Sequence, residues 1–439
     1  MRSRETIAEA RLTPTASAEE QLKRIRRALF YAALAPGLYQ AFSPSGYGFG
    51  PGYEMVAIAR SILHNGCFGN PFAVPTGPTA AEPPLYPFFL AGLIKLFGSP
   101  FYIAVATSLS VMAQATQIAL LPRLSLAVFG DLRPGLYGAA LSVLAYRMMP
   151  NWDTAFTACG VVAFCVFSVG IDRSKRPNVR AAWAGVFAGL LFLLNPSTVL
   201  VSAPWSVFLV VRSQLAWRRA LARCSAALFL FALVCSPWII RNDLRFGAPI
   251  VRSNLGMTLF ASNADCALPS LEATLKNGCY ASKHPNVDRT EANLLATLGE
   301  AAYDRRRIAA ALDWVRAHPG SFARLACQRA INFWFPPISS VWDACVWVLT
   351  ALSLPGLIVL YRKQADVAGL LAGIGLLYPT MYYFVVSDVR YRYPILWISA
   401  LCAGYAVFEG VGWARRALSG PRAWRVGYPC YHWREGLDN

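Results

Sequence analysis

Long runs without a charged side chain recur along this chain. They are residues 100–122, 154–171, 181–211, 224–240 and 367–387. A bilayer core needs about 20 apolar residues per spanning helix. Backbone polar groups in lipid must also be satisfied internally, and a helix does this within one segment. The pattern therefore predicts an all-α polytopic membrane protein, and not a large soluble protein with buried helices.

Composition agrees with that class. Of 439 residues, 56% are hydrophobic and only 15% are charged, whereas a soluble domain is about 45–50% apolar and about 25% charged. The net charge of +18 at first suggests nucleic acid as a partner. The basic residues, however, lie in short clusters beside the hydrophobic runs, as the positive-inside rule predicts. We therefore expect membrane lipids and no nucleic acid as partners. The clusters comprise Lys23, Arg24, Arg26, Arg27, Arg173, Lys175, Arg176, Arg180, Arg212, Arg218, Arg219, Arg223, Arg362, Lys363, Arg415 and Arg416.

Placing every basic cluster in the cytoplasm predicts about ten transmembrane helices. The run 181–211 counts as two of them, because Asn195-Pro196 is expected to break it. The expected spans are roughly 28–43, 100–122, 135–150, 154–171, 181–195, 197–211, 224–240, 341–361, 367–387 and 393–411.

This topology divides the chain into five parts and places both termini inside. The expected location is the inner (plasma) membrane, with the first span retained as a signal anchor. The parts are a basic cytoplasmic N-terminus (1–27), a transmembrane module (28–240) with a first outer loop (44–99), an extracytoplasmic loop region (241–337), C-terminal transmembrane helices (338–412) and a cytoplasmic tail (413–439).

The first outer loop contains two apolar segments that are too short to span. Residues 84–98 carry Lys95, and a crossing there would turn every later basic cluster outward. The second segment is Tyr53–His64, in which apolar residues recur at helical spacing, at Met55, Ile58 and Ile62. We predict two interfacial helices, joined by the turn-rich segment GNPFAVPTGPTAAEPP.

The loop region 241–337 is predicted to be mostly helical, with helices at 294–317 and 321–333. Its Cys266 and Cys279 are candidates for a disulfide outside the cytoplasm. Cys67 and Cys327 are competing partners. The chain has no CxxC or HExxH spacing and its four histidines are scattered, so neither a metal nor another cofactor is expected.

Charged residues at the outer membrane face are few, and each one is therefore informative. An arginine fork matches the oxygens of a lipid phosphate, and a carboxylate can take a proton from an incoming nucleophile. For each arginine, a simple headgroup contact is the alternative. The acids are Glu54, Glu82, Asp153 and Asp388, and the cations are Arg60, Lys95, Arg241, Arg245, Arg390 and Arg392.

Several segments together resemble the GT-C superfamily of integral-membrane glycosyltransferases, in particular the bacterial protein mannosyltransferase and lipid A aminoarabinose transferase family. The resemblance implies a sugar donor carried on polyprenyl phosphate and used on the outer face of the membrane. The segments are YEMVAIARSILHNGCFGNPF, GPTAAEPPLYPFFLAGLIKLFG, SPWIIRNDLRFGAPIVRSNLG, LGEAAYDRRRIAAALDWVRAHPGSF and DVRYRYPI.

Two positions depart from that family. Members usually carry an Asp where this chain has Pro51, and often a Lys where it has Glu82. The nearest acid to Pro51 is Glu54, which we predict to be the catalytic base, with Asp153 as the alternative. The residues predicted to contact substrate, phosphate above all, are Arg60, Glu82, Arg241, Arg390 and Arg392.

The function predicted from the sequence is transfer of a sugar from a polyprenyl-phosphate donor to an acceptor hydroxyl or phosphate. The acceptor is a glycolipid, a polysaccharide or a protein. Two alternatives stay open at this point. One is a non-catalytic or divergent protein with the GT-C fold, and the other is a transporter of lipid-linked substrates.

Overall fold

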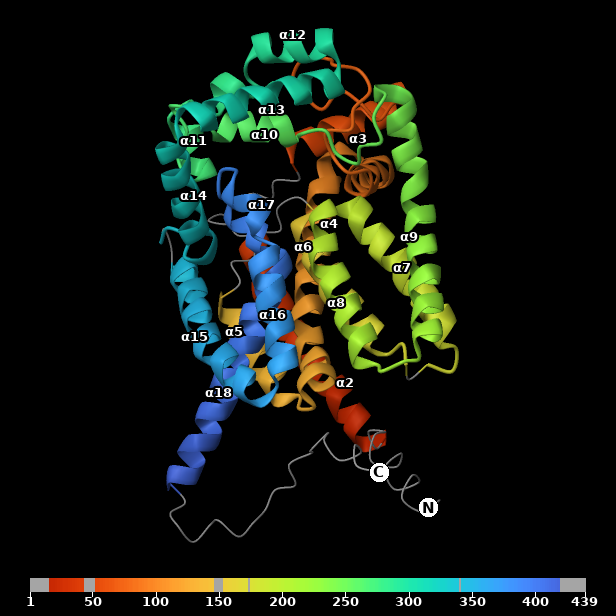
Figure 1. The fold of residues 1–439 in the computed structure, drawn as a ribbon, viewed down its shortest axis with the longest axis vertical. Coiled ribbons are helices and arrows are strands. Elements are labelled where there is room, and N and C mark those ends of the chain that lie inside the picture. The colour runs from red at the N-terminus through yellow and green to blue at the C-terminus, as the bar shows by residue number, and fades with distance from the viewer. Residues whose placement is uncertain (1–15, 43–51, 146–152, 173, 339–340, 419–439) are drawn as a thin grey trace.

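The computed structural model describes residues 16–42, 52–145, 153–172, 174–338 and 341–418. The regular structure of these ranges is helical, apart from two isolated β-bridges, Gly69–Pro78 and Ser270–Ser387. Long helices run side by side through most of the molecule, and shorter ones gather at one end (Figure 1). The all-α prediction is confirmed.

A helix is present at each predicted span. Six segments of the described chain are long and apolar enough to cross a membrane, and Thr154–Val169 and Pro196–Arg212 are apolar but shorter. The chain is thus a membrane protein with multiple spanning helices. The helices found at the ten predicted spans are α2 Ala16–Phe42, α4 Leu85–Phe129, α5 Arg133–Ala145, α6 Thr154–Val169, α7 Pro177–Leu194, α8 Val199–Arg212, α9 Trp217–Phe246, α15 Val341–Lys363, α16 Ala365–Leu377 and α18 Tyr393–Leu418. Residues 43 and 146–150 of two predicted spans lie outside the described residues.

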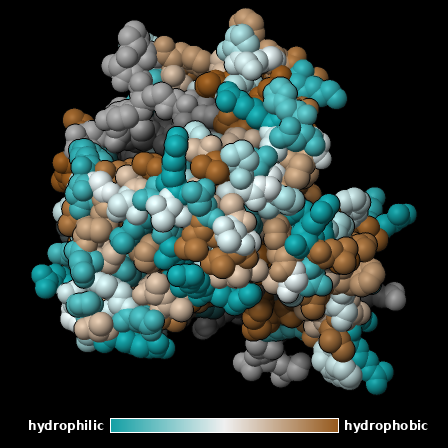
Figure 2. Space-filling model, turned by 90° about the horizontal axis from the view of Figure 1, so that it is seen from above, coloured by the Kyte–Doolittle hydropathy of each residue, from teal (hydrophilic) through white to brown (hydrophobic). Residues whose placement is uncertain are grey.

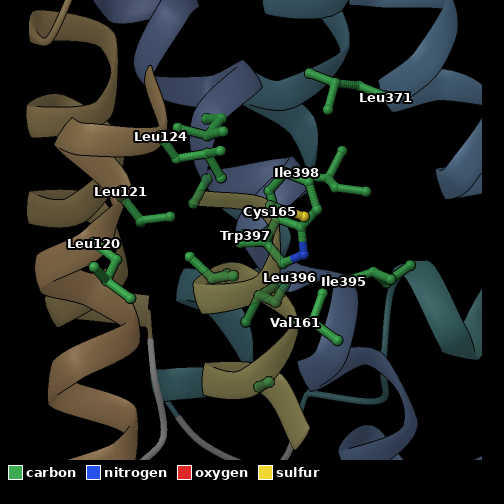
Figure 3. Packing of buried hydrophobic residues seen from close by; sticks show 14 of the residues in the cluster. Leu120, Leu121, Leu124, Val161, Cys165, Leu371, Ile395, Leu396, Trp397 and Ile398 are labelled. Atoms are coloured by element: carbon green, nitrogen blue, oxygen red, sulfur yellow. The ribbon is translucent and has the colours of Figure 1, made fainter. Parts of the chain in front are cut away.

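The core of the bundle forms around α18. Side chains of α4, α6 and α16 converge on Trp397, which is fully buried (Figure 3). The helix backbones also approach closely: a Cβ on Gly404 of α18 would lie 2.0 Å from the carbonyl oxygen of Pro134 in α5. Small residues at helix crossings are typical of membrane bundles, because close van der Waals packing replaces the hydrophobic drive that lipid cannot supply.

Two predicted segments are interrupted for local reasons. The span predicted at 367–387 corresponds to the candidate span Ala365–Tyr383, in which α16 ends at Leu377, since Pro379 has no N–H to continue it, and the short helix α17 Thr380–Tyr383 follows. The helix predicted at 294–317 is broken at Gly299, whose φ of 74° is left-handed. It is replaced by α12 Arg289–Leu298 and α13 Glu300–Ala317.

The first outer loop has the predicted pair of short helices. Helix α3 spans Tyr53–Asn65. Helix α4 is two helical segments joined across Gly98, whose φ of 74° and ψ of 167° turn the chain between residues 85–97 and the long segment that follows. Met55 of α3 and Leu90 of α4 are buried in one apolar cluster. Residues 85–97 and the long helical segment after Gly98 are therefore separate elements.

The loop region 241–337 covers the same end of the molecule as α3 (Figure 1). Its remaining helices are α10 Leu255–Ser262, α11 Leu271–Lys276 and α14 Pro319–Trp334, and the last confirms the helix predicted at 321–333. Seen from this end, hydrophilic and hydrophobic side chains are intermixed on the surface (Figure 2). Such a surface suits a region that meets both water and the membrane boundary.

The kink at Gly98 generates a test of topology. A membrane-impermeant thiol reagent should label cysteines introduced at Pro75 and at Ser99 from the same, outer side. Native Cys327, which is exposed and lies in the loop region predicted to be extracytoplasmic, serves as the outer reference. Labelling of the two introduced cysteines from opposite sides would mean that the first segment of α4 crosses the membrane.

Candidate functional site

A four-residue segment, Thr79 to Glu82, positions the site. The carboxylate of Glu300, at the start of α13, accepts hydrogen bonds from the Thr79 hydroxyl, from the Ala80 N–H (2.7 Å) and from the Ser253 hydroxyl (2.6 Å). Arg241 of α9 donates to the Thr79 carbonyl over 2.7 Å. The segment is therefore held from two sides, and this orients the side chain of Glu82.

Glu82 is buried and paired with Arg252. Arg252 Nη2 lies 2.8 Å from Glu82 Oε1, and Arg252 Nε donates to the Ala81 carbonyl over 3.1 Å. Burial raises the pKa of Glu82 to about 7, although the charge of Arg252 opposes the shift. The Arg252 side chain is still 33% exposed. Glu82 can thus change charge near neutral pH while Arg252 stays accessible to a ligand.

Glu54 lies in the first turn of α3, and its side chain is 12% exposed. Asn286 Nδ2 donates a hydrogen bond of 2.7 Å to Glu54 Oε1. Burial raises the pKa of Glu54, and this outweighs the lowering by its own backbone N–H and by the charges of Arg390 and Arg252. A carboxylate with a raised pKa is a better proton acceptor than one in bulk water.

Asp153 lies at the position before the first turn of α6 and is buried. Its Oδ2 accepts hydrogen bonds from Thr157 Oγ1 (3.0 Å) and from Asn195 Nδ2 (2.9 Å). Asn195 is the residue at which the long hydrophobic run was predicted to break. The break therefore supplies a side chain that fixes Asp153.

These groups form one electrostatic cluster, which we call the acid cluster: Glu54, Glu82 and Asp153. The charges of Glu54 and Asp153 both raise the pKa of Glu82, so the three carboxylates are close enough to interact. They come from α3, from the segment before α4 and from α6. Arg252 and Arg390 provide the opposing charge.

Arg390 reaches the cluster from the short 3₁₀ turn Val389–Arg392 that precedes α18. Its Nε lies 3.4 Å from Asp388 Oδ2, and its guanidinium stacks over the Tyr391 ring at 5.3 Å from the centroid. The Asp388 side chain also accepts a hydrogen bond from the Arg390 N–H. The charge of Arg390 lowers the pKa of Glu54, so the turn holds this arginine near enough to interact with the acid cluster.

The other two arginines predicted to bind phosphate make different contacts. Arg241 donates to the Thr79 and Phe68 carbonyls and lies over the ring of Trp238. Arg392 is 3% exposed and donates to the Trp334 carbonyl and the Thr350 and Ser399 hydroxyls. These contacts favour structural roles for both residues over phosphate binding.

The remaining predicted residues lie apart from the acid cluster or outside the described ranges. Arg60 is exposed on α3 and forms no ion pair with an acid of the described chain. Pro51 lies outside the described residues. Cys266 and Cys279 are joined in a disulfide. Within the described ranges, no group of three or more His, Cys, Asp or Glu side chains is arranged to hold a metal ion.

Arg252, Glu300 and Asn286 were not selected from the sequence. Their partners are 170, 220 and 232 positions away, so no local spacing indicates them. One indication of Arg252 was present in the sequence, because it lies in RNDLRFGAPIVRSNLG, which is part of a segment that resembles the GT-C family. It pointed to the segment containing Arg252 without selecting the residue.

No protein-family model and no curated protein sequence matches this chain. Solved structures do match. The apo oligosaccharyltransferase of Archaeoglobus fulgidus superposes with a TM-score of 0.53 at 14% identity, over 92% of this chain and 52% of that chain. The archaeal oligosaccharyltransferase AglB of the same organism, in complex with an inhibitory peptide and a dolichol-phosphate, gives 0.52 at 15% identity, with the same coverage. This chain shares their GT-C fold.

The chain spans about half the length of those oligosaccharyltransferases. A further structure, ArnT from Cupriavidus metallidurans bound to undecaprenyl phosphate, superposes with a TM-score of 0.37 at 13% identity, over 92% of this chain and 80% of that chain. The two archaeal structures confirm the GT-C fold expected from the sequence segments. Their sequence identities of 14% and 15% support a shared fold and nothing more.

The contacts of Arg392 predict a structural phenotype. Arg392→Ala leaves the Thr350 and Ser399 hydroxyls and the Trp334 carbonyl without this charged partner, and bonds to a charged group contribute about 1.5–3 kcal/mol each. We expect the apparent melting temperature in detergent to fall by several degrees. Arg316→Ala, at an exposed pair with Asp313, should change it little. Equal melting temperatures for the two variants would contradict the structural role.

Proposed function

We propose that this chain is a glycosyltransferase that moves a sugar from a polyprenyl-phosphate-linked donor to an acceptor hydroxyl or phosphate on the outer face of the membrane. The observation that carries the proposal is the acid cluster with Arg252 and Arg390 beside it, at the end of the helix bundle covered by the loop region. The shared fold supports it. The dolichol-phosphate bound in one matching structure is the class of lipid that we propose for this chain.

In this proposal Arg252, whose side chain is 33% exposed, and Arg390, whose side chain is 16% exposed, bind the donor phosphate. An arginine fork forms short, charge-assisted bonds to phosphate oxygens. Arg252 is paired with Glu82 and its charge also acts on Glu54, and Arg390, in the turn before α18, acts on Glu54 as well. A phosphate between them would place the anomeric carbon of its sugar near the acid cluster.

The reaction then needs one proton acceptor. The acceptor oxygen attacks the anomeric carbon and gives its proton to a carboxylate. The bond between that carbon and the phosphate oxygen breaks, and its electron pair leaves with the phosphate. Glu54 is our candidate for the base, because its carboxylate is largely buried and its pKa is raised. Asp153 remains the alternative, although its Oδ2 already accepts two hydrogen bonds.

The proposed topology has ten spans and places the acid cluster on the extracytoplasmic side of the plasma membrane. The first outer loop and the loop region 241–337 then lie on that side together, as their shared contacts require. Glu300 of the loop region holds Thr79 and Ala80 of the first loop. Both loops would therefore meet a lipid-linked donor at the level of its phosphate.

The base assignment is tested by two isosteric substitutions. Glu54→Gln keeps the shape and removes the basicity, so sugar transfer should fall by about 100-fold or more while donor binding changes little. Both quantities would be measured on purified protein in lipid nanodiscs. Asp153→Asn should retain more transfer than Glu54→Gln. The opposite order would assign the base to Asp153.

The pKa of Glu82, about 7, predicts a pH-dependent donor affinity. A negatively charged Glu82 repels the donor phosphate and competes with it for Arg252. A protonated Glu82 is neutral, so it neither repels the phosphate nor forms an ion pair with Arg252. Donor affinity should therefore be highest below about pH 7 and fall as the pH rises through that value. In Glu82→Gln this dependence should be lost and binding should stay tight. Binding isotherms of a polyprenyl phosphate at several pH values provide the test, and a wild-type affinity that rises with pH would contradict it.

A further inference from the structure

A segment of the loop region, residues 280–288, lies against the carboxylate that we assign as the base. Asn286 Nδ2 donates to Glu54 Oε1 over 2.7 Å. His284 Nε2 lies 3.8 Å from the same oxygen. Both residues are far from Glu54 in the sequence, and neither belongs to the acid cluster. The loop region thus contacts the Glu54 carboxylate directly through two side chains.

His284 is held in a single orientation. Its side chain is buried, the Tyr280 ring stacks on it at 4.8 Å between centroids, and Phe72 meets it edge-on at 5.8 Å. The Asn286 N–H donates to His284 Nδ1 over 3.2 Å. Burial lowers the pKa of His284 to about 4, so the ring is neutral at pH 7. Because Nδ1 accepts, this hydrogen bond assigns the ring proton to Nε2, the nitrogen that faces Glu54.

A disulfide-closed loop directly precedes the segment. Cys266 and Cys279 close it. Inside it, Asn277 Nδ2 donates to the Cys266 carbonyl over 2.8 Å, and the N–H of Tyr280, the first residue after the loop, donates back to the Thr274 carbonyl within it over 3.1 Å. The loop therefore determines where the chain enters residues 280–288.

The same loop is hydrogen-bonded to the chain that leads to Arg390. The Leu271 N–H donates to the Ser387 carbonyl over 2.9 Å, and the Ser387 N–H donates to the Pro269 carbonyl over 2.8 Å. Asp388 and Arg390 follow within three residues. One covalently closed loop thus connects the segment that contains His284 and Asn286 to the turn that contains Arg390.

We propose that His284 and Asn286 are positioning residues for the Glu54 carboxylate, and that the loop closed by Cys266–Cys279 fixes their place relative to Arg390. The proposal rests on the proposed function only in taking Glu54 as the base. The geometric part, that these residues set the state of Glu54, can be tested without any transfer assay. The titratable and charged groups that face Glu54 are Glu82, Arg252, Tyr280, His284 and Arg390.

The first test measures the protonation of Glu54 directly. A carbodiimide reacts with the protonated carboxyl, and mass spectrometry reports the modified fraction of Glu54 in the full-length protein at each pH. The bond from Asn286 favours the charged form and lowers the pKa of Glu54. Asn286→Ala should therefore move the pH of half-modification upward by about one unit. Asn286→Gln, which keeps an amide donor, should recover part of the shift.

The matched control is Asn293→Ala, an exposed asparagine on α12 in the same loop region, which should leave the modification profile of Glu54 unchanged. If Asn286→Ala also leaves it unchanged, the positioning role is overturned. The modification of Glu54 is informative only in folded protein. Melting temperature and monodispersity are therefore measured for each variant to identify one that has lost its fold. His284→Gln then serves as the second variant, with an altered Glu54 profile expected and an unaltered one overturning the role.

Transfer activity separates this proposal from the proposed function. If the positioning role and the base assignment both hold, Asn286→Ala raises the pH at which turnover is half-maximal on the acidic side by the same amount as the pH of half-modification. The KM for the donor stays near that of the wild type. A shifted modification profile with an unshifted activity profile keeps the positioning role and removes Glu54 as the base. An unshifted modification profile overturns the positioning role, whatever the activity does.

The disulfide is tested on the same readout. The Cys266→Ser/Cys279→Ser double variant should shift the modification profile of Glu54 in the same direction as Asn286→Ala, and Cys327→Ser, at an exposed free cysteine, should not. Wild-type protein reduced and alkylated under native conditions provides a second route if the double variant does not fold. A profile that stays in place after confirmed reduction would overturn the role of the disulfide loop.

Discussion

Buried irregular backbone must find its hydrogen-bond partners within the protein, and the buried segment from Thr79 to Glu82 shows how this chain meets that requirement. The Thr79 N–H donates to the Phe68 carbonyl, and the Ala80 carbonyl accepts from the Ser253 N–H. The Ala80 N–H donates to Glu300 and the Ala81 N–H to the Thr79 hydroxyl, while the Thr79 and Ala81 carbonyls accept from Arg241 and Arg252. Since these partners come from the first loop, α9, the chain after α9 and α13, this one segment joins the two outer loops.

The position of the acid cluster follows from that junction. Glu82 ends the segment, and its burial beside two other carboxylates would be unfavourable without the cations around it. Arg252 and Arg390 supply that compensation. The result is a site in which the negative charges are held close together and the positive charges remain partly accessible. Such a site can accept an anionic phosphate and take up a proton, the two events that transfer from a lipid phosphate involves.

The sequence was sufficient for the elements but not for their contacts. Uncharged runs predicted helices that the structure contains, and the short apolar segment 84–98 was correctly distinguished from the long helical segment that follows Gly98. Glu54 and Asp153 were found because acids at the membrane face are rare. Arg252, Glu300 and Asn286 could not be found in this way, because their roles arise from contacts between segments that are distant in the sequence. Arg241 and Arg392 illustrate the converse, since their positions suggested phosphate binding but their contacts are with the protein.

One structure would be decisive: the purified protein in lipid nanodiscs with a bound polyprenyl phosphate, determined by electron cryomicroscopy. We expect the phosphate within hydrogen-bond distance of the Arg252 or Arg390 guanidinium. The phosphate oxygen that would carry the sugar in the donor should face the acid cluster. A phosphate bound instead at the cytoplasmic basic clusters, with Arg252 and Arg390 contacting only protein groups, would contradict the proposed lipid-phosphate glycosyltransferase site.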